Sequence, residues 1–119
     1  MAQDVRKLLN DFTAGLENFS GQEGSKDAVG ALMGLLNTTY ADAALDTKTK
    51  ELISVAIACY SRCVYCIVYH TYQALAAGAK RDEILQAAMV SVAFGGGPSM
   101  AYSVSYLKDS LDEFEKDFK

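Results

Sequence analysis

The sequence has few positive charges, and they are scattered along the chain. Its 119 residues include 11 Lys or Arg against 15 Asp or Glu, which gives a net charge of −4 and an isoelectric point near 4.8. Nucleic acids and anionic membrane surfaces are bound by clustered Lys and Arg, and the sequence has no such cluster. The composition therefore argues against nucleic acid and membrane as partners.

Also lacking is an apolar run of the roughly 20 residues that a membrane-spanning helix needs. Two charge-poor stretches come nearest: residues 52–79 contain Arg62 as their one fully charged side chain, and residues 84–107 contain none. Polar residues interrupt the first stretch at Ser61 and Arg62, and three glycines and a proline interrupt the second. Both are interpreted as protein core. The N-terminus has no apolar secretory segment, so we expect a cytoplasmic protein.

Proline occurs once, and strand-like alternation of apolar and polar residues is rare. Because the length suits a single domain over residues 1–119, these features predict a one-domain, all-α fold. Apolar residues recur at helical spacing in six segments. The predicted helices cover about residues 3–18 and 27–40, a third from the cap at Asp46 or Thr47 to the cysteines, a fourth ending near Gly78, and then 82–94 and 98–114.

These helices are too apolar for one small monomer. The third, fourth and fifth are apolar nearly all round, and such helices have to be surrounded by other elements. The second is expected to face inward through Val29, Leu32, Met33, Leu35 and Leu36. A chain of this length offers too few neighbours, so we predict a homo-oligomer. The alternative is a monomer whose outer helices wrap the central ones.

Three cysteines lie within eight residues, and the one histidine of the chain follows them. This odd, clustered set is unlike the dispersed, even set of secreted disulfide-rich proteins. Cys63 and Cys66 form a C-x-x-C pair, whose Cα atoms on a helix lie close enough for a disulfide. His70 follows Cys66 by one turn on the same face, where its imidazole can take a proton from that thiol. Cys59 lies among apolar residues and is interpreted as core.

The residues alone leave the nucleophile open. If Ser61 caps the fourth helix, Cys63 lies in the first turn and is favoured, whereas His70 favours Cys66. Together with Cys59, these residues also supply the donors of a Cys₃His zinc site, but ligands spread over about 16 Å of one helix cannot surround one ion. We expect redox chemistry without bound metal or cofactor. Nearby tyrosines line a pocket or, as we favour for most, pack in an interface: Tyr60, Tyr65, Tyr69 and Tyr72.

The pattern of these residues resembles the alkylhydroperoxidase D group of the carboxymuconolactone decarboxylase superfamily. The signature of that group is a Glu, eleven residues, a C-x-x-C pair and a His four positions beyond the second Cys. Glu51, Cys63, Cys66 and His70 meet it here, and the likeness extends over about residues 45–94. By spacing alone, the carboxylate at position 51 is typical of a solvated group near a helix start.

The resemblance implies an all-α, alkylhydroperoxidase D-like bundle that assembles into homo-trimers or homo-hexamers and has peroxiredoxin-type activity. Cys66 would be the peroxidatic cysteine that attacks a hydroperoxide, and Cys63 would resolve the sulfenic acid to a disulfide. Glu51 and His70 would form the proton relay that activates Cys66. An external dithiol reductant, lipoyl or thioredoxin-like, would restore the pair.

Two other functions are alternatives. The lactone decarboxylase branch of the family generally lacks the cysteine pair, so Cys63 and Cys66 count against a lyase. A non-enzymatic, oligomeric thiol sensor is the third reading. This chain also has Tyr65 where some alkylhydroperoxidase D members carry a further histidine, and those members have a second related half.

Overall fold

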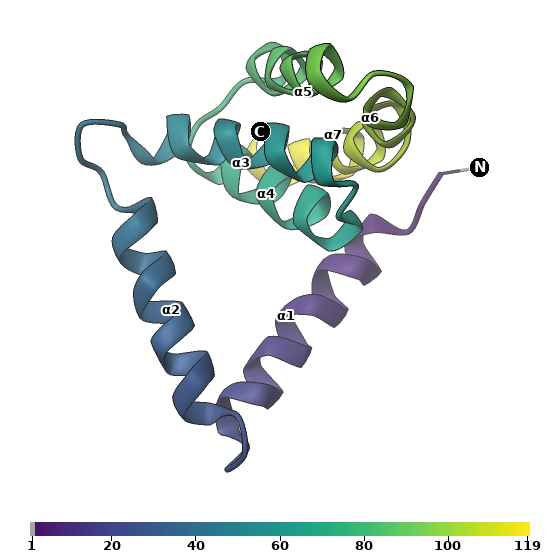
Figure 1. The fold of residues 1–119 in the computed structure, drawn as a ribbon. Helices are drawn as coiled ribbons and strands as arrows, with labels where there is room; N and C mark the ends of the chain where they lie inside the picture. The colour runs from purple at the N-terminus through teal and green to yellow at the C-terminus, as the bar shows by residue number, and fades with distance from the viewer. Residues whose placement is uncertain (1) are drawn as a thin grey trace.

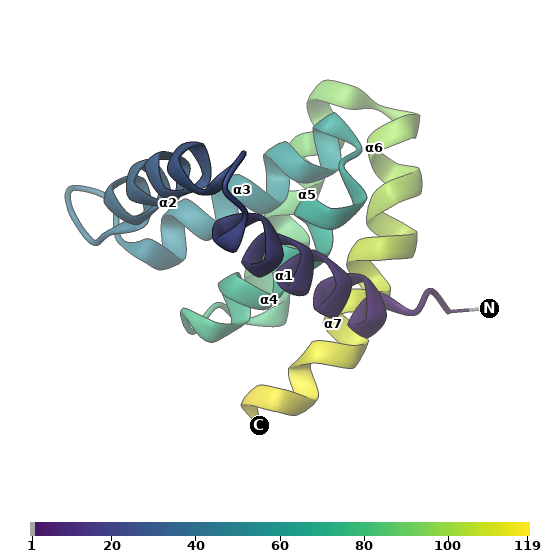
Figure 2. The ribbon, with the colours of Figure 1, turned by 90° about the horizontal axis from the view of Figure 1, so that it is seen from below.

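The computed structural model describes residues 2–119, over which the chain is all-helical and contains no strand. The all-α prediction is therefore confirmed. Two long helices, α1 (Val5–Gly21) and α2 (Lys26–Tyr40), form the arms of an open V, and the other helices pack across its wide end (Figure 1). Seen from below, α1 runs along α4 and α7, whereas α2 lies to one side (Figure 2).

Helix α1 begins later and extends further than the sequence pattern indicates. The Asp4 carboxylate caps the helix start by accepting a hydrogen bond from a first-turn N–H. At the other end the helix continues through Ser20, whose hydroxyl donates to the Leu16 carbonyl within the same helix. The helix ends at Gly21, so the predicted end near residue 18 is wrong by almost one turn.

Helices α3 (Thr47–Ser61) and α4 (Val64–Ala76) pack against each other and carry the signature residues. The Asp46 carboxylate accepts a hydrogen bond from the Thr49 N–H, so the predicted cap at Asp46 is confirmed. The predicted end of α4 is also confirmed. Gly78 follows the helix with a φ of +91°, a conformation that glycine adopts without a steric penalty.

The remaining chain packs around α3 and α4. Helix α5 (Arg81–Gly95) lies mainly against α3. The predicted sixth helix is one rod with an irregular middle, in which a π-helical turn separates two α-helical parts. Its parts are α6 (Gly97–Tyr102), the π-helical turn η1 (Ser103–Leu107), α7 (Lys108–Phe114) and a final 3₁₀ turn, η2 (Glu115–Phe118).

The core lies where α3, α4, α5 and the last rod meet. Its largest fully buried apolar side chains are Phe114, Ile67, Ile84, Leu107, Leu111, Val5, Val55 and Val68. Burying one such side chain stabilises the fold by about 1.5–3 kcal/mol. Most of these residues belong to the two charge-poor stretches, as expected. Within residues 2–119, no helix has both the length and the apolar character needed to cross a bilayer.

Helix α2 contradicts the prediction that its apolar side chains face inward. All of α2 lies within the described residues, and none of its side chains is buried. Leu35 is 62% exposed and Leu32 is exposed as well, whereas Val29 and Met33 are half-buried beside α1. The cause is the V-shaped arrangement, because no other element within residues 2–119 covers the outer side of α2.

Candidate functional site

The packing of α3 against α4 brings Glu51 and His70 together. The Nδ1 atom of His70 lies 2.7 Å from the Oε1 atom of Glu51, and Glu51 is only 6% exposed. A buried carboxylate needs such a partner, because removing it from water is costly. The solvated position that spacing alone predicts for Glu51 is therefore wrong.

The turn between α3 and α4 places Cys63 at the start of a helix. Helix α3 ends at Ser61, its C-cap Arg62 adopts the left-handed conformation with φ 57°, and the N–H of Cys63 then donates to the Ala58 carbonyl. Cys63 is the N-cap of α4, and its Sγ atom accepts the Cys66 N–H at 3.3 Å. Ser61 belongs to α3 and donates to the Ala58 carbonyl, so the predicted cap at Ser61 is wrong.

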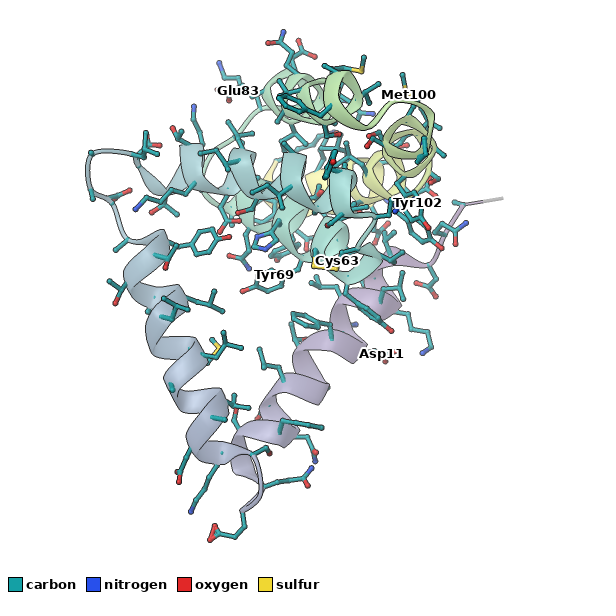
Figure 3. The ribbon with its side chains drawn as sticks, in the orientation of Figure 1. Asp11, Cys63, Tyr69, Glu83, Met100 and Tyr102 are labelled. Atoms are coloured by element: carbon teal, nitrogen blue, oxygen red, sulfur yellow. A yellow bond between two sulfur atoms is a disulfide. The ribbon has the colours of Figure 1, made fainter. Side chains whose placement is uncertain are left out.

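Cys63 and Cys66 form a disulfide, with their Cα atoms 5.2 Å apart. This confirms that the C-x-x-C pair can bond within one helical turn. Cys63 and Tyr69 lie on the side of α4 that faces the space between α1 and α2 (Figure 3). In the reduced state, the N–H that points at Cys63 and the positive end of the α4 dipole favour negative charge on its sulfur.

Two cavities meet at His70. The smaller, of about 150 Å³, is bounded by Cys66 and by the hydroxyl groups of Ser54, Ser61 and Tyr40. The larger, of about 390 Å³, lies between the arms of the V. Glu51 lines this cavity together with mainly apolar residues. The imidazole therefore stands between the sulfur of one cavity and the carboxylate of the other.

Aromatic side chains from α2 and α4 contact the imidazole. Tyr40, the last residue of α2, stacks on His70 with ring centroids 5.7 Å apart and planes inclined by 19°. Tyr69 meets His70 edge-on at 5.2 Å and contacts Phe12 of α1 at 5.4 Å. Burial, with the neighbouring carboxylate of Glu51 as a smaller cause, raises the pKa of Tyr69 and keeps its phenol neutral. Tyr69 thus lines the site.

Sequence reasoning missed Tyr40 and Phe12. Tyr40 precedes His70 by thirty residues and Phe12 by still more, and no helical spacing relates side chains over such distances. Their aromatic character is the only signal in the sequence, and it is shared with many core residues. The fold of the α1–α2 hairpin brings Tyr40 to the imidazole and Phe12 to the neighbouring ring of Tyr69.

Cys59 lies outside the site. Its side chain is fully buried against the last rod, and this burial raises the pKa of its thiol, with a hydrogen bond to Ser103 acting in the opposite direction. The interpretation of Cys59 as core is confirmed. Across residues 2–119, no three His, Cys, Asp or Glu side chains are arranged to hold a metal ion.

The model of the carboxymuconolactone decarboxylase family matches residues 26–109, a range that contains Glu51, the cysteine pair and His70. The chain belongs to this family. Two relatives are uncharacterized proteins. One, from Cupriavidus necator, is 34% identical over 76 residues, which is 64% of this chain and 67% of the relative. The other, uncharacterized protein 4 in the cox locus of Paracoccus denitrificans, is 35% identical over 85 residues, or 71% and 76%.

Solved structures of carboxymuconolactone decarboxylase family proteins have the same fold. One from Legionella pneumophila matches with a TM-score of 0.82 at 31% identity, over 97% of both chains. One from Thermotoga maritima matches with a TM-score of 0.71 at 30% identity, over 93% of this chain and 94% of its own. The Thermotoga protein is described as having a possible involvement in an antioxidative response.

Proposed function

We propose that this family member is a cytoplasmic thiol peroxidase and disulfide oxidoreductase that uses Cys66 and Cys63 to reduce hydroperoxides. The observation that carries the proposal is the contact between Glu51 and His70 at the cavity that Cys66 lines. An imidazole whose Nδ1 is held by a carboxylate has its Nε2 left to take a proton from a thiol. The disulfide between Cys63 and Cys66 is the expected product of turnover.

The first chemical step creates a sulfenic acid. His70 takes the thiol proton of Cys66, and the thiolate attacks the terminal oxygen of the hydroperoxide. The S–O bond forms as the O–O bond breaks, and the departing alkoxide takes the proton from His70 to leave as an alcohol. Glu51 stabilises the imidazolium that exists between these proton transfers.

The second step closes the disulfide. The Cys63 sulfur attacks the sulfenic sulfur of Cys66, and the hydroxide that leaves combines with the Cys63 proton to form water. The hydroperoxide is thereby reduced by two electrons to alcohol and water, while two thiols are oxidised. An external dithiol, lipoyl or thioredoxin-like, then returns the pair to thiols by exchange, and a reducing cytoplasm supplies such a reductant.

The test is a single-turnover measurement on the reduced protein with tert-butyl hydroperoxide. Wild type is expected to consume one equivalent of hydroperoxide and to lose both thiols of the pair. Cys66→Ser is expected to consume none. Cys63→Ser is expected to react once and to hold a sulfenic acid at Cys66, which dimedone and mass spectrometry detect. Cys59→Ala is the matched control and is expected to behave as wild type, because Cys59 lies outside the site.

Consumption of hydroperoxide by Cys66→Ser at the wild-type rate would contradict the proposal. A sulfenic acid trapped at Cys63 in that variant would instead reverse the two cysteine roles. If wild type does not react with hydroperoxide but its sedimentation changes on oxidation, the pair is a thiol sensor. Lactone turnover that survives replacement of both cysteines would identify a lyase.

We also propose that the partner of this chain is a further copy of itself, in the trimer or hexamer that the resemblance implies. The accessible surface is 7092 Å², against about 6,300 Å² for a compact monomer of 12.8 kDa. Two apolar surfaces account for much exposed area: the outer side of α2 with Leu32 and Leu35, and the α3–α5 side with Ile57, Val90 and Phe94, the last 82% exposed. Copies that cover these surfaces would remove them from water.

Sedimentation velocity tests the assembly. Wild type is expected to sediment as a trimer or hexamer, and Leu35→Glu is expected to shift the protein towards monomer, because it places a charge in the interface. Asp27→Asn, at the exposed start of the same helix, is the control. A wild-type protein that remains monomeric at about 100 µM contradicts the proposal.

A further inference from the structure

Tyr40 is the side chain of the α1–α2 hairpin that stacks on the imidazole of His70. It closes α2, lies thirty residues before His70, and borders both the large and the small cavity together with His70. Its ring is nearly parallel to the imidazole. Nothing in the signature of the family accounts for this contact, because the signature begins at Glu51.

The hydroxyl groups around Tyr40 fix the orientation of its phenol. The Ser54 hydroxyl donates to the Lys50 carbonyl at 2.9 Å, within α3. A serine hydroxyl has one hydrogen, so in the short hydrogen bond between Tyr40 and Ser54 the phenol is the donor. The phenol hydrogen is therefore committed to α3, and the ring of Tyr40 presents its face to the imidazole.

Three contacts hold the imidazole plane. Glu51 binds Nδ1, Tyr40 covers one face, and Tyr69 meets the ring edge-on. A carboxylate contact at one nitrogen leaves rotation about that hydrogen bond open, whereas a ring stacked on the face restricts it. With the plane fixed, the second ring nitrogen, Nε2, belongs to a side chain that borders the same cavity as Cys66.

We propose that Tyr40 is a positioning residue, which holds the His70 imidazole in the orientation that activates Cys66 and which favours the imidazolium once the thiol proton has been transferred. The negative face of an aromatic ring attracts a cation placed against it. The proposal rests on the proton relay proposed above. It adds a residue of the α1–α2 hairpin to a site otherwise built from α3 and α4.

The test measures the reactivity of Cys66 without any peroxide. In the Cys63→Ser background, iodoacetamide alkylation of Cys66 is followed by mass spectrometry from pH 5 to pH 9. The ionisable groups that the contacts place around the imidazole are Glu51 from α3, Tyr40 from α2, and Cys66 and Tyr69 from α4. Apart from Tyr40 itself, none of these ionisable groups is changed in any of the variants.

Tyr40→Leu is expected to slow alkylation at pH 7 by about two- to fivefold and to move the midpoint of the pH profile upward, because the cation loses its aromatic neighbour. Tyr40→Phe keeps the stacked ring and is expected to remain within about twofold of the parent. Tyr72→Leu is the matched control: it removes a half-buried tyrosine that packs on Phe114, and it is expected to leave the profile unchanged.

An unchanged profile for a folded Tyr40→Leu overturns the proposal, and so does an equal loss in Tyr40→Phe and Tyr40→Leu, which would assign the effect to the hydroxyl. If Tyr40→Leu does not fold, NMR on the wild type decides: an Overhauser effect between the Tyr40 and His70 ring protons is expected, and its absence overturns the proposal. Failure of the wild type to consume hydroperoxide affects only the proposed peroxidase, because alkylation needs no peroxide.

Discussion

Helices α2 and α4 are similar in length and both rich in apolar residues, yet the fold uses them differently. Helix α4 buries Ile67, Val68, Thr71, Ala74 and Leu75, whereas none of the fully described α2 side chains is buried. The difference lies in their neighbours, since α4 is enclosed by α1, α3 and the last rod, whereas α2 packs along α1 and meets α3 and α4 mainly at its Tyr40 end. An apolar helix therefore needs other elements packed against it, but its composition does not show whether those elements belong to the same chain or to another copy.

The comparison also separates two ways of contributing to function. Helix α4 carries Cys66 and His70 and fixes them through a packed core. Helix α2 contributes one side chain at its end, Tyr40, while its middle is exposed. Variants along α2 should thus change stability little and assembly or reactivity more, whereas variants along α4 should first change stability.

The largest expected difference is between a buried and an exposed aliphatic residue. Ile67→Ala in α4 is expected to lower the free energy of unfolding by about 2–5 kcal/mol, because it leaves a cavity in the core. Leu35→Ala in α2 is expected to change it by less than about 0.5 kcal/mol in the monomer. Urea denaturation at low protein concentration measures both. Equal losses in the two variants would show that α2 is as well packed as α4.

Glycines give the next largest contrast. A methyl group at Gly95 would overlap the buried Ser99 hydroxyl and lie 3.1 Å from Cδ1 of Tyr60, so Gly95→Ala is expected to cost about 1–3 kcal/mol. Gly34→Ala meets open space in the middle of α2 and is expected to stabilise the protein by about 0.5–1 kcal/mol. The sign of the change in Tm distinguishes the two regions, and a loss at Gly34 would refute the open packing of α2.

The smallest effect concerns the attachment of α1 to the C-terminal segment. The hydrogen bond from Arg6, followed by that from Lys116, lowers the pKa of Glu113 below its ordinary value of 4.5. In acid the unfolded chain therefore binds a proton before the folded one, so the stabilisation is complete above about pH 4.5 and is lost as the pH falls through the lowered pKa. Stability should fall less between pH 6 and pH 3 in Glu113→Gln than in wild type.

A matched control for this measurement is Glu23→Gln at the apex of the V. Among residues 2–119, Glu23 pairs with Lys26 alone, three residues away and exposed, and such pairs contribute little. Its variant is expected to show the wild-type pH dependence. The same dependence in Glu113→Gln and wild type would mean that the Arg6 contact does not contribute to stability in solution.

Much of the architecture was predictable because its signals are local. Helical periodicity, the Asp46 cap and Gly78 depend on neighbours within a few residues, and each prediction is confirmed. The Ser61 cap was wrong because a helix end is decided between adjacent candidates, and here the left-handed Arg62 moves the start to Cys63. Which of two nearby residues becomes the N-cap depends on backbone geometry, and residue type alone does not determine that geometry.

The site was predictable only in part. Cys63, Cys66 and His70 follow one another on a single helix, so their spacing indicates their proximity. The burial of Glu51 against His70 depends on how two helices pack, and the family resemblance supplied what spacing could not. Tyr40 depends on the closure of a hairpin thirty residues away, for which the sequence has no local signal.

The π-helical turn in the last rod has a consequence for how this segment tolerates change. Ser99, Ser103, Leu107 and Leu111 are all buried at four-residue intervals, although each such step in a regular α-helix advances by about 40° around the axis. The wider turn offsets the advance of the step from Ser103 to Leu107 and so limits the drift of the four around the axis. A π-helical turn holds about one residue more than an α-helical turn, so the loss of one residue from 103–107 can be absorbed by a return to regular α-helix, which keeps Phe114 in the core. The loss of one residue from the regular α7, ahead of Phe114, would instead turn everything beyond it by about 100° and carry Phe114 out of the core. Within this rod, a deletion is a local event at the π-helical turn and changes the facing of the whole C-terminal end elsewhere.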